Sequence, residues 1–272
     1  MLPEGGRISN VCYQMNEEKT MIKVGIIGGS GLDDPDILKD AQDVEIYTPY
    51  GDPSSPLKTG QINGVDTVLL ARHGRKHQYS PTQVNNRANI MAFKEMGVTH
   101  IIATTACGSL RQEIDRGHLV ILDQFIDFTR FRKNTFHESF EKGPVHTAMA
   151  EPFDAVLREC LFRTADGMGL DAHEKGCVVT IEGPRFSTVA ESNMFRLWGA
   201  DVINMSTAPE AMLANEADIP YAAVAMSTDY DCWKQDEEPV TWDEILKVFN
   251  QNADNVKQLL KAAVKALADQ SE

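Results

Sequence analysis

Short apolar runs alternate with helix-patterned segments along this chain, and this alternation restricts its fold more than any other feature. Apolar runs of strand length lie at residues 23–27, 99–105 and 221–226. Segments with helical spacing lie between and after them, the longest at 242–268. Strands that alternate with helices are typical of a parallel sheet with helices on its faces. We therefore expect an α/β fold with a central mixed, mostly parallel sheet flanked by helices.

The remaining segments complete this plan. Residues 57–62 and 66–70 predict a hairpin, because the Asn63-Gly64 pair between them is preferred in two-residue hairpin turns. Residues 130–149 are polar and irregular, which indicates a long loop that could cover a site. No convincing linker is present, so we expect a disordered extension over residues 1–20 and a single domain over 21–272. Further strands are expected at 119–125, 177–181 and 202–205, and further helices at 83–96, 153–168, 189–198 and 209–217.

The composition narrows the class of partner and the compartment. The 272 residues carry a net charge of −14, with a short local basic cluster at 72–77, so no nucleic-acid partner is expected. Five scattered cysteines without a disulfide framework are typical of a reduced compartment. No apolar run reaches membrane-spanning length, and residues 1–20 lack the apolar core of a secretory signal. We expect a cytoplasmic protein with no membrane partner, for which a nuclear location is also compatible.

Two carboxylates at the end of a predicted strand are the first candidates for chemistry. Asp229 and Asp231 follow the apolar run at 221–226. In parallel α/β sheets, ligands bind at the carboxyl ends of the strands. A carboxyl group in an enclosed site tends to keep its proton, and a group that can release a proton there can act as a general acid.

Other predicted strand ends carry small or basic residues. The Gly28-Gly29-Ser30-Gly31 stretch could cradle a phosphate, but its spacing matches neither common phosphate-loop pattern, and a tight turn explains it equally well. Arg72 and His73 could hold an oxyanion or lie in a solvated turn.

Two further strand ends add hydroxyl and aromatic groups. Residues 104–109 could supply donors to an anion, and Cys107 among them is a nucleophile or, more simply, a small buried residue. Phe186 could stack on a flat ring or belong to the core. No cluster has metal-ligand spacing. Taken together, these strand ends predict one pocket with an oxyanion site at one end and a flat heterocycle at the other.

Six ordered motifs strengthen this interpretation. They lie at residues 24–32, 69–75, 104–110, 180–187, 200–210 and 225–233. In these motifs the chain resembles the 5′-methylthioadenosine phosphorylase family, which belongs to the trimeric purine nucleoside phosphorylases. The resemblance extends over nearly the whole chain. It implies that 5′-methylthioadenosine and phosphate react to give adenine and 5-methylthioribose 1-phosphate. It also implies a homotrimer and no metal or organic cofactor, with inorganic phosphate as a co-substrate.

The resemblance also implies roles for individual residues. Asp229 and Asp231 would address N7 and the 6-amino group of the purine, and Asp229 would act on the leaving base. His146 would reach in from the neighbouring subunit. Trp242 stands where a smaller aliphatic residue is common in the family, which predicts a reshaped 5′ pocket. The phosphate-binding set would be Ser30, Arg72, His73, Thr105, Ala106 and Ser206, and the nucleoside-binding set Phe186, Ser187, Met205, His146, Trp242, Ile245 and Leu246.

Three other functions compete with this one. A broader adenosine or purine nucleoside phosphorylase would share the mechanism, although two carboxylates at the base disfavour a 6-oxopurine. A dinucleotide-dependent oxidoreductase would explain the glycine turn after the first strand, but the glycine spacing is wrong for it. A nucleoside-binding module would bind without turnover.

Overall fold

The computed structural model describes residues 21–29, 37–141, 143–236 and 241–270, without the side chains of 242–246 and 251. Residues 1–20 and Ser30 therefore lie outside the described part. The strands are β1 (Lys23–Gly28), β2 (Lys39–Val44), β3 (Leu57–Ile62), β4 (Val65–Ala71), β5 (His100–Ser109), β6 (Leu119–Ile121), β7 (Gln124–Phe128), β8 (Ala172–His173), β9 (Cys177–Ile181), β10 (Val202–Asn204) and β11 (Tyr221–Tyr230). The helices are α1 (Asn86–Glu95), α2 (Ala155–Gly167), α3 (Val189–Leu197), α4 (Thr207–Glu216) and α5 (Trp242–Asp269), with a short 3-10 helix, η2, at Pro81–Gln83.

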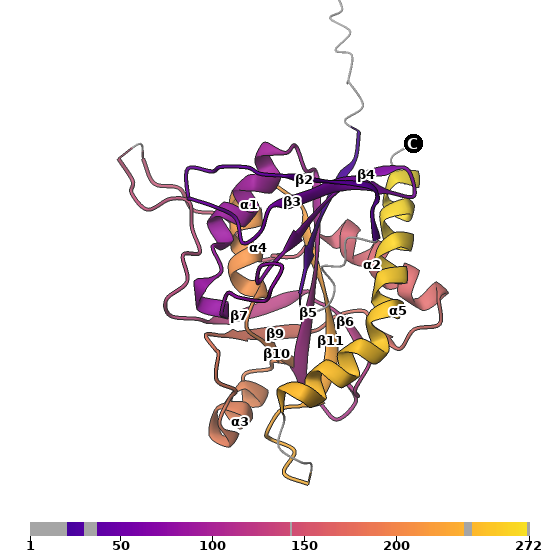
Figure 1. Cartoon of the computed structure of the whole chain (residues 1–272). Coiled ribbons are helices and arrows are strands. Elements are labelled where there is room, and N and C mark those ends of the chain that lie inside the picture. Colours follow the sequence, from indigo (N-terminus) through magenta and orange to yellow (C-terminus); the bar gives the residue numbers. More distant parts are fainter. Residues whose placement is uncertain (1–20, 30–36, 142, 237–240, 271–272) are drawn as a thin grey trace, which may run out of the picture.

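One mixed sheet runs through the molecule in the order β2-β3-β4-β1-β5-β10-β9-β7 (Figure 1). The strand β5 is its centre, since it pairs in parallel with β1 and β11 and in antiparallel fashion with β10. The pairs β1–β4, β9–β10 and β7–β9 are also parallel. The prediction of a mixed, mostly parallel sheet is confirmed. Because β11 and β10 both lie next to β5, residues from distant parts of the sequence meet at one end of that strand.

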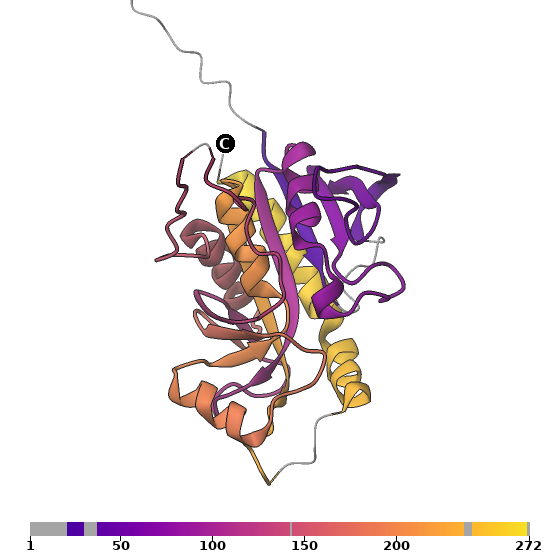
Figure 2. The same ribbon diagram turned by 90° about the vertical axis from the view of Figure 1, so that its left-hand side faces the viewer.

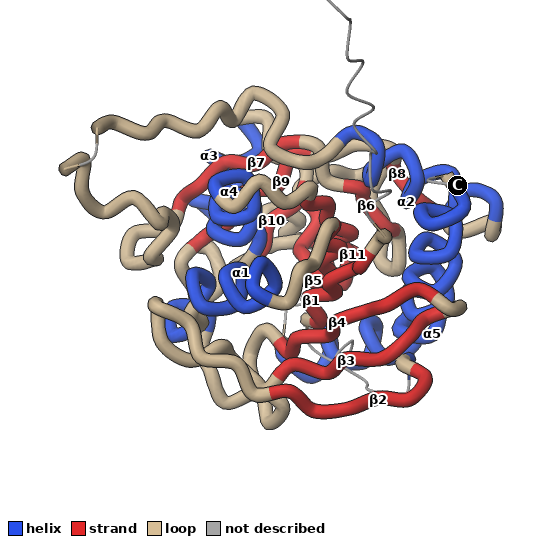
Figure 3. Tube along the Cα trace, turned by 90° about the horizontal axis from the view of Figure 1, so that it is seen from above, coloured by secondary structure: helices blue, strands red, loops and turns tan. Residues whose placement is uncertain are grey.

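Helices cover both faces of this sheet (Figure 3). The helices α1 and α4 lie together on one side, and α2 and α5 pack against each other on the other side. The helix α3 lies at the end of the molecule opposite the C-terminal end of α5 (Figure 2). Among the described helices, none is long and apolar enough to cross a membrane.

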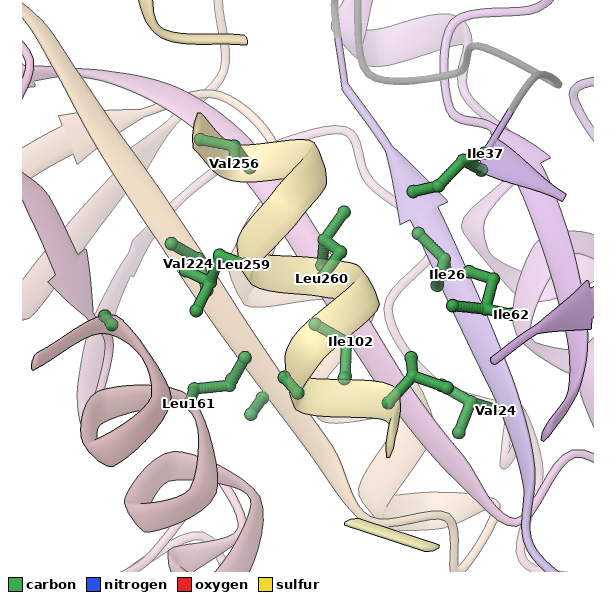
Figure 4. Packing of buried hydrophobic residues seen from close by; sticks show 14 of the residues in the cluster. Val24, Ile26, Ile37, Ile62, Ile102, Leu161, Val224, Val256, Leu259 and Leu260 are labelled. Atoms are coloured by element: carbon green, nitrogen blue, oxygen red, sulfur yellow. The ribbon is translucent and has the colours of Figure 1, made fainter. Parts of the chain in front are cut away.

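The core is divided between the two faces by the alternation of side chains along the strands. In β5, Ile102 faces the cluster under α2 and α5, whereas Ile101 faces the cluster under α1 and α4. Figure 4 shows Leu259 and Leu260 of α5 between Val224 of β11 and the strand β1. Leu259 is 0% exposed, and full burial of such a side chain contributes about 1.5–3 kcal/mol. The amphipathic closing helix therefore holds β11 and β1 together from one side.

Several predicted boundaries were wrong for tertiary or capping reasons. The strand predicted at 119–125 is two strands, because β6 pairs with β11 and β8 whereas β7 pairs with β9. The helix predicted from residue 83 begins at Asn86, since the Asn85 side chain accepts a hydrogen bond from the Ala88 N–H and caps it. The strand β11 continues through Asp229, and β2 and β8 were not predicted. The Asn63-Gly64 hairpin turn is confirmed, with positive φ at both residues.

Candidate active site

One cavity of about 500 Å³ opens at the ends of β5, β9, β10 and β11. A cavity of this size suits a small molecule such as a nucleoside with an anion beside it. His146 does not line it: this residue is exposed and packs its ring against Phe140. The side chains of Trp242, Ile245 and Leu246, at the start of α5, lie outside the described part. The predicted residues that do line the cavity are Arg72, His73, Thr105, Ala106, Phe186, Ser187, Met205, Ser206, Asp229 and Asp231.

A buried ion pair forms the cationic end of the cavity. Arg72 follows β4, is 2% exposed, and donates from Nε and Nη2 to the Glu210 carboxylate at 2.5 and 3.0 Å. Its Nη1 donates to the Thr104 carbonyl oxygen at 2.7 Å, and the Tyr221 hydroxyl donates to Glu210 Oε2 at 2.8 Å. Burial alone would lower the pKa of Arg72, but the charge and hydrogen bonds of Glu210 raise it above its ordinary value. The guanidinium is thus held charged, with one N–H left on each Nη for a ligand.

Hydroxyl groups and a helix start lie beside this cation. Thr105 Oγ1 is 3.2 Å from Ser206 Oγ, and both residues line the cavity. Ser206 is the N-cap of α4, whose first turn carries the positive end of the helix dipole. Hydroxyls, a helix N-terminus and a guanidinium are the groups that bind phosphate. This end of the cavity can therefore hold an oxyanion.

His73 contributes no positive charge to that end at neutral pH. Burial, followed by the nearby charge of Arg72, lowers the pKa of His73 from 6.5 to about 4. Its Nδ1 is 2.9 Å from the Tyr79 carbonyl oxygen, which can only accept, so Nδ1 carries the proton and donates. The neutral ring then presents an unprotonated Nε2, which can accept a hydrogen bond from an O–H of an anion or of a sugar.

The two acids line the same cavity because β11 is irregular there. The register between β11 and β5 shifts between Ser227 and Asp229, and such a bulge redirects the side chain that follows it. Opposite the bulge, a Cβ at Gly108 would lie 3.0 Å from Asp229 Oδ1 and 3.4 Å from the Asp231 Cβ. The absence of a side chain at Gly108 makes room for both carboxylates.

Each carboxylate also has a hydroxyl partner. Thr228 Oγ1 donates to Asp229 Oδ2 at 2.8 Å, and Ser187 Oγ donates to Asp231 Oδ2 at 2.6 Å. The second bond joins the loop after β9 to the end of β11. Asp231 is 5% exposed. The carboxylates are therefore held in place before any ligand binds.

Cys107 lines the cavity but is not activated. Burial, followed by the charge of Asp229, raises the pKa of this thiol well above its ordinary value. A thiol that keeps its proton is a poor nucleophile. Cys107 is therefore better interpreted as a small buried residue than as a nucleophile.

The aromatic wall is open to solvent. Phe186 lines the cavity and is 44% exposed, so it is available to a flat ligand rather than buried in the core. Met205, which also lines the cavity, packs against the Gly183 turn, where an added Cβ would collide with its sulfur atom. Gly183 has a φ of 66°, which glycine adopts without strain.

Some lining residues were missed by sequence reasoning. The mouth of the cavity includes His77, Tyr79, Ser80 and Pro81, from a polar loop without any motif. Glu210 was also missed, although a single acid within the otherwise uncharged segment 207–214 is a signal of a buried ion pair. Among the described residues, no group of three His, Cys, Asp or Glu side chains is placed to hold a metal ion.

The comparison with protein families shows the superfamily of this chain. A model of the Phosphorylase superfamily matches residues 23–265 of this chain. This range contains the whole described sheet and every residue that lines the cavity.

Individual relatives identify the family within this superfamily. The S-methyl-5′-thioadenosine phosphorylase of Xenopus tropicalis is 56% identical over 251 residues, covering 91% of this chain and 89% of the relative. That of Danio rerio is 54% identical, covering 89% and 88%. The methylthioadenosine phosphorylase of Schistosoma mansoni, solved with adenine, superimposes with a TM-score of 0.87 at 41% identity, over 90% of this chain and 92% of the other. The chain belongs to the S-methyl-5′-thioadenosine phosphorylase family of the phosphorylase superfamily.

Proposed function

We propose that this protein catalyses the phosphorolysis of 5′-methylthioadenosine to adenine and 5-methylthioribose 1-phosphate. The observation that carries the proposal is that a single cavity has Arg72, Thr105 and Ser206 at one end and Asp229 and Asp231 at the other. The relatives support it: they are named for this reaction, and one S. mansoni structure holds adenine while a mutant form holds methylthioadenosine.

The chemistry follows from the two ends of the cavity. As the bond between the sugar C1′ and the purine N9 breaks, its electron pair goes to the purine and positive charge grows on the sugar. An oxygen of the phosphate bound at Arg72 stabilises this charge and then forms the new bond to C1′. Asp229, in its protonated form, offsets the negative charge on the base by donating a proton, or a strong hydrogen bond, to N7, and the carboxylate regains a proton from water between turnovers. The products are adenine and the sugar 1-phosphate.

The second acid supports selection of the base. Asp231 already accepts a hydrogen bond from Ser187 through Oδ2, which leaves further lone pairs on the carboxylate for a 6-amino donor. A 6-oxopurine would present an acceptor to the same carboxylates. Sites built around hydrogen bonds reject such analogues strongly.

A broader adenosine phosphorylase is the second candidate. One of the similar S. mansoni structures is an adenosine/methylthioadenosine phosphorylase, 40% identical and with a TM-score of 0.85. The mechanism would be the same, and only the tolerance of a 5′-hydroxyl in place of a 5′-methylthio group would differ. We propose that residues 242–246 set this tolerance.

We further propose that the protein works as a homotrimer in which His146 of one subunit completes the 5′ side of its neighbour's cavity. The support is that His146 is exposed and does not line the cavity of its own chain. Large apolar side chains are also left exposed, including Phe131 at 73% and Leu197 at 87%. Sedimentation of the full chain distinguishes a trimer from a monomer.

The proposed reaction is tested by adenine release from 5′-methylthioadenosine with and without phosphate, beside adenosine and inosine. Asp229→Asn is expected to lower turnover roughly 10²–10⁴-fold, the range of general acid catalysis. Asp66→Asn, on the exposed part of β4, is the matched control and should retain activity. Release that does not need phosphate, or release from inosine alone, would contradict the proposal. Unchanged turnover in Asp229→Asn would remove this acid from the mechanism.

A further inference from the structure

A carboxylate outside the cavity joins its own segment to two others. Glu182 directly follows β9 and does not line the cavity, and its side chain is 17% exposed. Its Oε1 accepts from Thr82 Oγ1 at 2.6 Å and from Arg132 Nε at 2.8 Å. Its Oε2 accepts from the backbone N–H groups of Arg130 at 2.6 Å and Phe131 at 3.1 Å.

Glu182 connects a segment next to the cavity with the segment that carries Phe186 and Ser187. Thr82 directly follows Pro81, at the mouth of the cavity, whereas Phe186 and Ser187 lie a few residues beyond Glu182 and face the proposed purine end. Residues 130–132 begin the long loop that leaves β7. Arg132, whose side chain is 1% exposed, bonds both the Glu182 carboxylate and, from Nη2 at 2.6 Å, the Glu182 carbonyl oxygen.

An ionised carboxylate satisfies all of these hydrogen bonds at once. All four hydrogen bonds to the Glu182 side chain come from donors. A carboxylate accepts at both oxygens, whereas the amide of a glutamine accepts at one. Burial alone would raise the pKa of Glu182, but the hydrogen bonds, first that of the Arg130 N–H and then that of Thr82, lower it to about 2. The group is therefore charged across the physiological range.

We propose that Glu182 is a positioning residue that holds the purine-facing segment 183–187 against the mouth segment 79–82. This inference rests on the proposed function for the identity of the purine. It predicts that the carboxylate acts mainly on binding of the base, because Arg72, Thr105 and Ser206 belong to other segments. His73 is the phosphate-binding candidate that contacts segment 79–82, through the Tyr79 carbonyl oxygen at 2.9 Å.

The test measures the Kd of adenine by calorimetry and the KM of phosphate by turnover in the full chain. Glu182→Gln should weaken adenine binding about tenfold, the effect expected when charge-assisted hydrogen bonds are lost. Thr82→Val removes only the bond to the mouth segment and should weaken it about threefold, as a single neutral-donor bond does. The KM of phosphate should stay within twofold of its value in the unmodified protein in both variants. A change of that size is smaller than the loss of one hydrogen bond would cause.

Asp201→Asn is the matched control. Asp201 accepts from Arg111 Nε at 2.9 Å and from the backbone N–H of Cys177 at 2.9 Å, and so binds an arginine and the main chain at the opposite end of β9. This variant should lose stability without losing adenine affinity.

The outcomes separate this inference from the proposed reaction. Adenine affinity unchanged in both Glu182→Gln and Thr82→Val would overturn the positioning role, and so would an equal rise in the KM of phosphate. If Glu182→Gln does not fold, the exposed Thr82→Val variant decides alone. An unmodified protein that binds adenine but releases none from 5′-methylthioadenosine would refute the reaction, while the adenine titrations would still decide the role of Glu182.

Discussion

Removal of the charge on Glu210 is expected to destabilise the protein strongly. Glu210 is 1% exposed and is the counter-ion of Arg72, which is 2% exposed. In Glu210→Gln, the guanidinium stays buried without a negative partner, and no opposite charge then offsets the free-energy cost of its desolvation. Breaking a buried ion pair in this way costs about 3–5 kcal/mol. Because domains are stable by only about 5–15 kcal/mol, this loss is a large part of the total.

The assay is urea unfolding in phosphate-free buffer, because phosphate bound at Arg72 would replace part of the lost charge. Addition of phosphate should then recover part of the loss in Glu210→Gln. Tyr221→Phe is the matched control: it removes only the 2.8 Å hydrogen bond to Glu210 and leaves the ion pair. We expect this control to cost about 1.5–3 kcal/mol, the range for a bond to a charged group.

Two results would refute this reasoning. A loss below about 1 kcal/mol in Glu210→Gln, the scale of an exposed ion pair, would show that Arg72 is not held in a desolvated site. A loss in Tyr221→Phe equal to that in Glu210→Gln would show that the hydroxyl, and not the charge, stabilises the network.

Two further predictions concern the same cavity. In the folded protein the pKa of His73 is about 4, whereas its ordinary value is 6.5. The free energy of unfolding should therefore fall as the pH drops from about 6.5 to about 4, because the unfolded chain binds this proton more readily. The fall should be less steep in His73→Gln. Parallel pH profiles of the two proteins would contradict the conclusion that the folded His73 ring is neutral. Gly108→Ala places a Cβ 3.0 Å from Asp229 Oδ1 and 3.1 Å from Ile203 Cγ2. It should lower turnover on the order of 10²-fold through misplacement of the acid, with an unchanged circular dichroism spectrum, and normal turnover would show that the carboxylates can shift freely.

The local elements of this protein could be predicted from its sequence because their signals are local. The Asn63-Gly64 turn requires positive φ at two adjacent positions, and the residues themselves favour it. Period-two alternation and continuous apolar runs located β1, β9 and β11, and the polar residues after these strands indicated where a ligand would bind. The class of fold followed from the order of these elements.

The arrangement of the site was decided by tertiary structure. Ser187 and Asp231 are far apart in the sequence, and they meet at 2.6 Å because β10, next to β9, and β11 both lie beside β5. Glu210 acquires its role in the same way, when α4 packs against the sheet and its carboxylate reaches Arg72 at the end of β4. No local pattern encodes which strands become neighbours. That choice depends on the burial of apolar surface over the whole sheet, and it also determines which charges lose water and must find a partner.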